Sequence, residues 1–258
     1  MKQKRPNLNS VEKALKILLA FQSQHSSWGV RDLSAHLDFS PATVQRTLQT
    51  LKAYAFVDQD PDSRQYRLGN IYFQFLDTLQ STYPITHAAL PFMRSLSSLT
   101  QETVHLNVID GMERICIDSI ESPQYLKASM PIGNRSPLYA GATPKCLLAF
   151  SPKNFIDNYV KQAKFTLLTE NTITNIKIFR SEIAAIRKRG YAKSLGERTP
   201  GIGSISAPVV NHRGMILAAI SLAIPELRFK NNNHRNLCLK KLLNVTKNFS
   251  KTMGYISE

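Results

Sequence analysis

A pair of helical segments separated by only two residues constrains this fold more than any other feature. The first segment carries Val30, Leu33 and Leu37 at helical spacing, and only Asp38 and Phe39 lie between it and the second. The second segment begins with Ser40 as its cap and Pro41 at the first helical position, a strong start signal. So short a connection is typical of a helix-turn-helix. We therefore expect the first part of the chain to contain this motif.

A further helical pattern precedes the pair, and a hairpin pattern follows it. Ser10 is the expected N-cap of the first helix, whose apolar stripe is Val11, Ala14, Leu15, Leu18 and Leu19. After the pair, two short strands flank a polar turn, which predicts a β-hairpin wing. This order favours a winged helix-turn-helix over residues 1–69. A small helical bundle without a role in DNA binding is the alternative.

The second helix of the pair turns short polar side chains away from its apolar face. A helix that enters the major groove needs slim side chains and hydrogen-bond donors. We expect Gln45 and Arg46 to contact base edges, Ser40 and Thr43 to contact phosphate, and the wing arginines to contact the DNA backbone. The candidate DNA-binding residues are Ser40, Ala42, Thr43, Gln45, Arg46, Gln49, Thr50, Arg64 and Arg67.

Net charge is strongly positive but unevenly distributed. The chain carries +15, of which residues 1–81 contribute +3 (10 basic, 7 acidic) and residues 82–258 contribute +12 (23 basic, 11 acidic). A basic balance favours nucleic acid as a partner. Most of the excess nevertheless lies outside the predicted DNA-binding domain, where a solvated basic surface is the simpler interpretation.

Cysteine and histidine placement argues against metal sites and disulfides. The three cysteines, Cys116, Cys146 and Cys238, are far apart, and the six histidines show no metal-ligand spacing. We expect no metal and no cofactor. No apolar run approaches the roughly 18 residues of a membrane span, and the N-terminus lacks the apolar core of a signal peptide. We therefore expect a cytoplasmic protein with no membrane partner.

Residues 70–83 predict an amphipathic, aromatic-rich helix, which either links the domains and pairs subunits or packs in an ordinary core. Residues 84–258 mix helices with antiparallel hairpins, which predicts an α+β domain. One hairpin centres on Asp110-Gly111, a second spans residues 204–224, and a further strand is expected within residues 124–133. Helices are expected at 90–101, 143–151, 151–163, 174–190 and 234–254.

The glycines at 201 and 203 fit no catalytic template. A phosphate-binding loop requires a lysine after its last glycine and then a helix, but here a strand pattern follows. The GxSxG pattern fails because Ile202 and Ser206 flank Ser204. We therefore expect no catalytic residues. Either the segment is a turn into a strand, or its N–H groups and Ser204 form one wall of an anion-binding pocket.

Several motifs in order resemble the IclR-type (isocitrate lyase regulator) family of bacterial transcription regulators. They are FSPATVQRTLQTLKAYAFV, YRLG, QETVHLNVIDG, PIGNRSPLYA, PKCLLAF, IRKRGYA and SISAPVVNHRG, and they span nearly the whole chain. Four residues depart from the family pattern: Asp38, Ala55 and Pro144, where glycine is usual, and Ser204, where cysteine is common. Asp38 should still permit the turn, because aspartate tolerates left-handed backbone.

The resemblance implies a winged helix-turn-helix, a linker helix and a GAF/PAS-like effector domain. It implies a homodimer or dimer of dimers that binds a two-fold operator in double-stranded DNA, most often as a repressor, and a small organic acid as effector. The implied effector residues are Ala128, Ser136, Ala142, Thr143, Ser194, Ile202, Gly203, Ser204, Ser221 and Ala223. Two alternatives stay open: a second domain that serves only oligomerisation or protein contacts, and an enzyme with an appended DNA-binding module.

Overall fold

The structure, a computed structural model, describes residues 9–22, 25–82 and 84–255. The chain divides into two compact units, residues 1–83 and 84–258. None of the helices in these described ranges is long and apolar enough to cross a bilayer.

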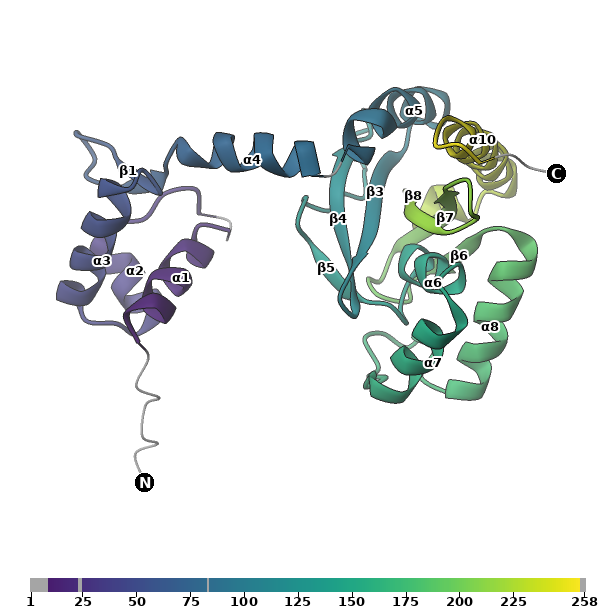
Figure 1. The fold of residues 1–258 in the computed structure, drawn as a ribbon, viewed down its shortest axis with the longest axis horizontal. Helices are drawn as coiled ribbons and strands as arrows, with labels where there is room; N and C mark the ends of the chain where they lie inside the picture. Colours follow the sequence, from purple (N-terminus) through teal and green to yellow (C-terminus); the bar gives the residue numbers. More distant parts are fainter. Residues whose placement is uncertain (1–8, 23–24, 83, 256–258) are drawn as a thin grey trace. The chain divides into compact units, whose positions relative to one another are not determined.

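The first unit is a winged helix-turn-helix followed by one more helix (Figure 1). The antiparallel wing pairs Val57 with Leu68, and its Tyr66 also bridges to Trp28. The core of this unit includes Ile17, Leu33, Val44 and Leu48. The elements are α1 (Ser10–Ala20), α2 (Val30–Leu37), α3 (Pro41–Ala53), β1 (Val57–Gln59), β2 (Tyr66–Leu68) and α4 (Ile71–Thr82).

The first helix differs from its prediction in two ways. Asn9, not Ser10, is the N-cap, in a capping box with Glu12. The expected stripe is only partly correct: Ala14 and Leu18 pack against the core beside buried Ile17 and Ala20, whereas three of its members are exposed: Val11, Leu15 and Leu19. Apolar residues lie on two faces of α1, so periodicity alone did not identify the buried face.

The turn between α2 and α3 forms as expected. Asp38 caps α2 in the left-handed conformation, with φ of 55°. The Ser34 hydroxyl donates a hydrogen bond to the Phe39 carbonyl at 2.6 Å. Ser40 caps α3, its side chain accepting from the Thr43 amide, with Pro41 at the first turn as predicted.

The second unit is built on one six-stranded antiparallel sheet with the order β5-β4-β3-β8-β7-β6. This arrangement confirms the predicted α+β class. Its strands are β3 (Thr103–Asp110), β4 (Glu113–Ile120), β5 (Arg135–Pro137), β6 (Ala192–Leu195), β7 (Ile202–Val210) and β8 (Ile216–Pro225). Its helices are α5 (Ile85–Thr100), α6 (Ala142–Ala149), α7 (Lys153–Gln162), α8 (Ile176–Arg189), α9 (Glu226–Phe229) and α10 (Asn232–Thr252).

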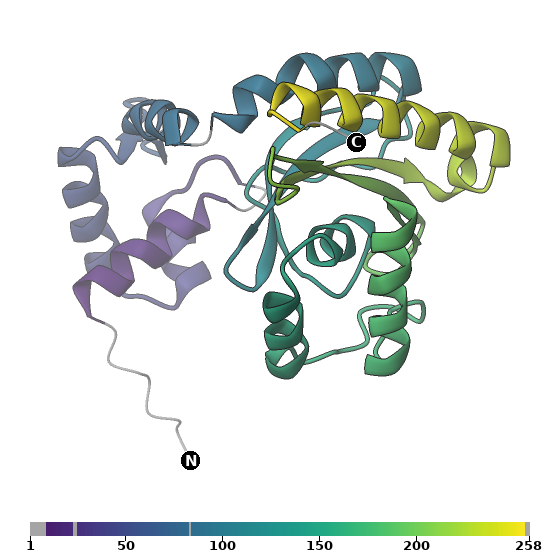
Figure 2. The same cartoon turned by 45° about the vertical axis from the view of Figure 1, so that its right-hand side comes forward.

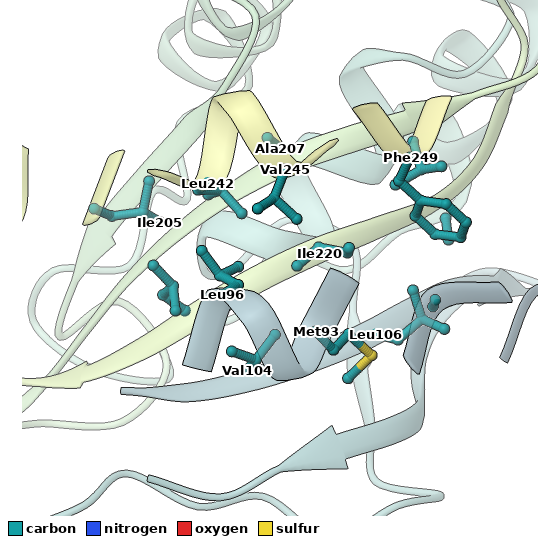
Figure 3. Packing of buried hydrophobic residues seen from close by; sticks show 14 of the residues in the cluster. Met93, Leu96, Val104, Leu106, Ile205, Ala207, Ile220, Leu242, Val245 and Phe249 are labelled. Carbon is teal, nitrogen blue, oxygen red and sulfur yellow. The ribbon is translucent and has the colours of Figure 1, made fainter. Parts of the chain in front are cut away.

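The two faces of this sheet have different covers. Figure 2 shows α5 (blue) and α10 (yellow) side by side over one face, with α6, α7 and α8 (teal to green) on the other. Figure 3 shows the core between the sheet and the first pair of helices, where Met93 and Leu96 of α5 and Leu242 and Phe249 of α10 pack on the strands. Strand residues alternate between the faces. Leu106, Ile205 and Ile220 therefore face α5 and α10, whereas the opposite face mixes apolar residues with polar ones such as His105, Ser204 and Ser221.

The strand expected within residues 124–133 does not form. This segment is a loop, and the short strand β5 begins only at Arg135. Pro123 and Pro131 lack the N–H group that a sheet ladder requires, which accounts for the difference.

Candidate functional site

The outer face of α3 carries the predicted DNA-binding residues of the first unit. Val44, Leu48 and Leu51 bury the opposite face, which holds the helix against the core. The exposed predicted residues of the helix are Ala42, Arg46, Gln49 and Thr50, and the cap residue Ser40 is exposed as well. An exposed arginine among short side chains is the surface that a recognition helix requires.

Three other predicted residues on this helix have partners within the unit. The Ser40 and Thr43 hydroxyls lie 2.8 Å apart as part of the helix cap. Gln45 is half-buried, and its side-chain amide donates to the Tyr66 hydroxyl of the wing at 3.4 Å. Arg46 is therefore better placed than Gln45 to reach a base edge.

Both wing arginines are exposed. Arg64 lies in the turn with φ of 59°, and Arg67 lies on β2. Arg67 pairs with Asp58 of β1 at 3.2 Å. Because both partners are exposed, this ion pair is weak, and a phosphate group can compete for the guanidinium.

A cavity of about 310 Å³ lies on the face of the sheet that α6 covers in the second unit. Its floor crosses five strands, from Arg114 of β4 and His105 of β3 to β8, β7 and finally Ser194 of β6. The loop of residues 127–130, the start of α6 and residues 197–199 form its walls. Such a volume suits a small organic ligand.

Eight of the ten predicted effector residues line this one cavity: Ala128, Ala142, Thr143, Ser194, Ile202, Ser204, Ser221 and Ala223. They come from segments nearly 100 residues apart in the sequence, from the loop after β4 to β8. The fold therefore brings together most of the residues that the family resemblance implied.

Gly203 and Ser136 do not line the cavity. Gly203 pairs on both sides within the sheet, with Leu195 and Ile224, and a Cβ at this position would collide with the ring of Phe229 on the apolar face. The prediction for Gly203 is therefore wrong, because successive strand residues point to opposite faces and only Ile202 and Ser204 face the cavity. Ser136 instead accepts a hydrogen bond at 3.0 Å from Nε of Arg114 and so orients that side chain.

Arg114 is a buried cation with neutral partners, and its side chain is 1% exposed. Its guanidinium donates to the Asn134 carbonyl at 3.1 Å and lies 3.4 Å from the Asn107 side-chain oxygen. Burial, reinforced by nearby Arg198, lowers the pKa of Arg114 to about 10. The group is therefore still charged at neutral pH.

Arg198 approaches the same point of the cavity. One of its nitrogens lies 3.4 Å from the Met130 sulfur, and a nitrogen of Arg114 lies 3.1 Å from that same atom. Burial lowers the pKa of Arg198 as well. Among the described residues, no carboxylate lies within 4 Å of either guanidinium.

Among the described residues, Glu197 is the one acidic residue in the cavity wall, and Lys145 neutralises its charge. Glu197 accepts from the buried Lys145 ammonium at 2.6 Å through one oxygen and from the Gly141 amide at 3.0 Å through the other. This pair fastens the segment after β6 to the start of α6. Lys127 likewise pairs with Glu121. Arg114 and Arg198 therefore dominate the potential inside the cavity.

His105 supplies a further polar group to the cavity. It is 2% exposed, and its Nε2 has no hydrogen-bond partner among the described residues. Burial and then the two arginines lower the pKa of His105 to about 4, so the ring is neutral at pH 7. A buried nitrogen without a partner is costly, and a ligand atom can relieve that cost.

The sequence patterns did not identify Arg114, His105, Glu197 or Arg198. A partial signal exists in β3, where Thr103, His105 and Asn107 alternate with apolar residues. That pattern marks a polar face, but it does not tell whether water or a cavity covers it. No group of three or more histidine, cysteine or acidic side chains suited to a metal ion occurs in the described ranges.

An exposed recognition helix with a wing, carried by a chain that also holds an α+β unit, defines a helix-turn-helix transcriptional regulator. The IclR helix-turn-helix domain model matches residues 10–61, and the model of the bacterial transcriptional regulator IclR C-terminal domain matches residues 78–251. The chain belongs to the IclR family, whose members are DNA-binding regulators and not enzymes.

Named relatives cover most of the chain. The HTH-type transcriptional regulator KdgR of Dickeya chrysanthemi is 31% identical over 96% of this chain and 81% of its own length. The DNA-binding transcriptional repressor YiaJ of Escherichia coli K12 is 29% identical over 86% of this chain and 80% of its own. These relatives confirm the family assignment.

Solved structures share the fold. Thermotoga maritima IclR superposes with a TM-score of 0.83 at 27% identity, covering 96% of this chain and 99% of that one. An IclR homologue from Microbacterium hydrocarbonoxydans, crystallised with 4-hydroxybenzoate, has a TM-score of 0.81 at 16% identity and covers 95% of this chain and 99% of that one. The second likeness concerns the fold alone.

Proposed function

We propose that this chain is a transcriptional repressor whose affinity for a two-fold operator is controlled by a small organic acid bound in the cavity. One observation carries the proposal: the cavity holds two guanidinium groups without a carboxylate partner among the described residues. Uncompensated cations in a low-dielectric site favour an anionic ligand. We place this action on DNA in the cytoplasm.

The hydroxyls along the cavity floor support the same ligand class. Ser194, Ser204 and Ser221 offer hydrogen bonds to a carboxylate or to hydroxyl groups of the acid. At the opposite wall, the Gly141 amide at the start of α6 already donates to Glu197, whereas the first turn that follows has no side-chain cap from Gly141. Amides at the start of a helix lack intrahelical partners and favour negative charge.

The named relatives support both parts of the proposal. YiaJ is named a repressor, and the Microbacterium homologue was crystallised with 4-hydroxybenzoate, which is a carboxylate. Neither fact identifies the effector of this chain, whose cavity carries its own set of charged residues.

Apolar side chains of the first unit support pairing of two copies. Phe73 of α4 is 71% exposed, and other large apolar residues are exposed on the same helix: Phe75, Leu76 and Leu79. Packing within the unit accounts for Phe75, which contacts Phe56, but leaves Phe73, Leu76 and Leu79 unexplained. Pairing of two recognition helices would match a two-fold operator with half-sites about 34 Å apart. We propose a homodimer, which can assemble further into a dimer of dimers.

The test combines ligand screening with DNA binding. Purified protein is screened by thermal shift against small organic acids, and an operator is selected from random-sequence DNA. We expect an acid that raises the melting temperature and releases the operator. Ser204→Leu, which fills the cavity floor, should bind the operator normally and lose the response to the acid. Ser181→Leu, exposed on α8, is the matched control and should retain it.

Two outcomes would contradict the proposal. A normal response of the Ser204→Leu protein would move the ligand out of this cavity. If no acid changed either the melting temperature or operator binding, the second unit would serve only oligomerisation or protein contacts, which is the rival function.

A further inference from the structure

One end of the cavity, which we call the guanidinium end, holds Arg114 and Arg198 and therefore carries more positive charge than one carboxylate neutralises. Nitrogens of Arg114 and Arg198 both lie within 3.4 Å of the Met130 sulfur. Two cations are thus held around one neutral thioether, which is only a weak hydrogen-bond acceptor. Like charges this close are costly unless an anion lies between them.

Neighbouring groups leave that position open to a ligand. Arg114 is fixed from behind by Ser136 and Asn134, so its guanidinium cannot withdraw into solvent. His105 lines the same cavity, and its buried Nε2 has no partner within the described residues. This end therefore combines two guanidinium groups with one unsatisfied ring nitrogen.

A separate group of donors lies at the other end of the floor. Ser194 and Ser204 belong to β6 and β7, whereas Arg114 belongs to β4, with β3 and β8 between them. The uncapped first turn of α6 also belongs to this end, and Thr143 lines the cavity there. Glu197 does not repel an anion at this end, because Lys145 and the Gly141 amide satisfy its carboxylate.

We infer that the effector is a small organic acid with two anionic groups, one held by Arg114, Arg198 and His105 and the other by the hydroxyl and amide end. This inference rests on the proposed function and specifies the ligand class. The anionic group held by Arg114, Arg198 and His105 is either a carboxylate or a phosphate, since guanidinium groups bind both.

Matched pairs of acids test the number of charges. Isothermal titration calorimetry on the full-length protein compares succinate with succinamate, adipate with adipamate, and 3-phosphoglycerate with glycerate. Within at least one pair, the dianion should bind about tenfold or more tightly, as loss of a charge-assisted hydrogen bond predicts. A preference in the carboxylate pairs identifies a dicarboxylate, and one in the last pair identifies a phosphorylated acid.

One arginine variant, compared with a control variant, tests whether an anionic group of the ligand binds at Arg198. Arg198→Gln should weaken binding of the dianion by about tenfold and bring both members of the preferred pair to within about twofold of each other, because a monoanion can instead bind at the hydroxyl and amide end. Arg213→Gln, in the exposed turn between β7 and β8, is the control and should retain the full preference. The melting temperature of each variant, measured without ligand, shows that it is folded.

The outcomes separate this inference from the function on which it rests. If monoanions and dianions bind equally in every pair, or if Arg198→Gln weakens both members alike, the effector is a monoanion and the proposed function stands. If no organic acid binds in the pairs or in the broader thermal-shift screen, the proposed function itself fails.

Discussion

Ala55 holds the tight turn between α3 and the wing in an unfavourable backbone conformation. Its φ is 59°, in the left-handed region that costs a residue with a Cβ atom about 1–2 kcal/mol. Gly69 lies against it: a Cβ there would collide with the Ala55 carbonyl oxygen, and its amide donates to Phe56. Glycine at position 69 is therefore needed for this close backbone approach, whereas the strain at Ala55 remains.

Ala55→Gly should stabilise the first unit by about 1 kcal/mol, because glycine adopts this φ without strain. Urea unfolding followed by the fluorescence of Trp28 measures the effect, since this sole tryptophan is buried in the core of that unit. The same substitution at exposed Ala35, inside α2, should destabilise by about 1 kcal/mol. Equal changes at both positions would contradict the backbone explanation.

His105 gives the second unit a pH-dependent stability. Burial and the charges of Arg114 and Arg198 lower its pKa to about 4, against an opposing effect of Glu121. Lys127 lines the same cavity. Between pH 6.5 and 4, the unfolded chain binds a proton at this residue that the folded protein does not bind. Stability is thus present above about pH 6.5 and decreases as the pH falls towards 4.

The expected loss from His105 is up to about 3 kcal/mol over that range. Unfolding of the wild type and of His105→Gln, followed by circular dichroism between pH 4.5 and 7.5, measures it. The variant should lose less stability on acidification than the wild type. Identical slopes for the two proteins would show that His105 is not the responsible group.

At the scale of elements, α4 places large apolar side chains in solvent. Tyr72 and Phe75 contact Phe56 of the same unit, with ring centroids about 6 Å apart, which anchors one side of the helix. Phe73 lies outside this cluster and is the most exposed of the group. Soluble proteins seldom leave such residues together on one element unless they form an interface.

Phe73→Glu should therefore weaken self-association by about tenfold or more, because it replaces a buried aromatic contact with a desolvated charge. Sedimentation velocity over a range of protein concentrations measures the dissociation constant. Gln74→Glu introduces the same charge at the neighbouring exposed position and should have a much smaller effect. Unchanged association of the Phe73 variant would exclude α4 from the interface.

At the scale of the whole molecule, charge and DNA recognition are separated along the chain. Residues 1–81 carry only +3 of the +15 net charge, although they contain the recognition helix. We therefore expect specificity to depend on a few side chains of α3, and bulk charge to contribute mainly salt-dependent attraction to any anionic surface.

Arg46→Ala should weaken binding to the selected operator by about 1–3 kcal/mol and change binding to scrambled DNA much less, as expected for a base-edge contact. Fluorescence anisotropy at several salt concentrations measures both affinities. Arg213→Ala, a matched loss of charge in the second unit, should affect the two DNAs equally. An equal loss on both DNAs in the Arg46 variant would assign this residue to a phosphate.

The amino-acid sequence determined the class of the fold and the recognition helix. Ser40 and Pro41 mark the start of α3 through local backbone chemistry, and Asp38 fits its left-handed turn for the same reason. The α+β class followed from hairpin and helix patterns, which are also local. Family motifs supplied eight residues of the cavity, and their positions in the sequence alone gave no reason for them to meet.

Only the tertiary structure decided which faces are buried and which charges face one another. The two apolar faces of α1 are equivalent by periodicity, and packing chose Ile17 over Leu15. Gly203 lies one residue from two cavity residues, yet alternation turns it towards Phe229. Arg114 and Arg198 are 84 positions apart, and they meet at Met130 because the sheet and its loops bring them there. Such long-range proximity depends on the packing of the whole unit, which no local pattern encodes.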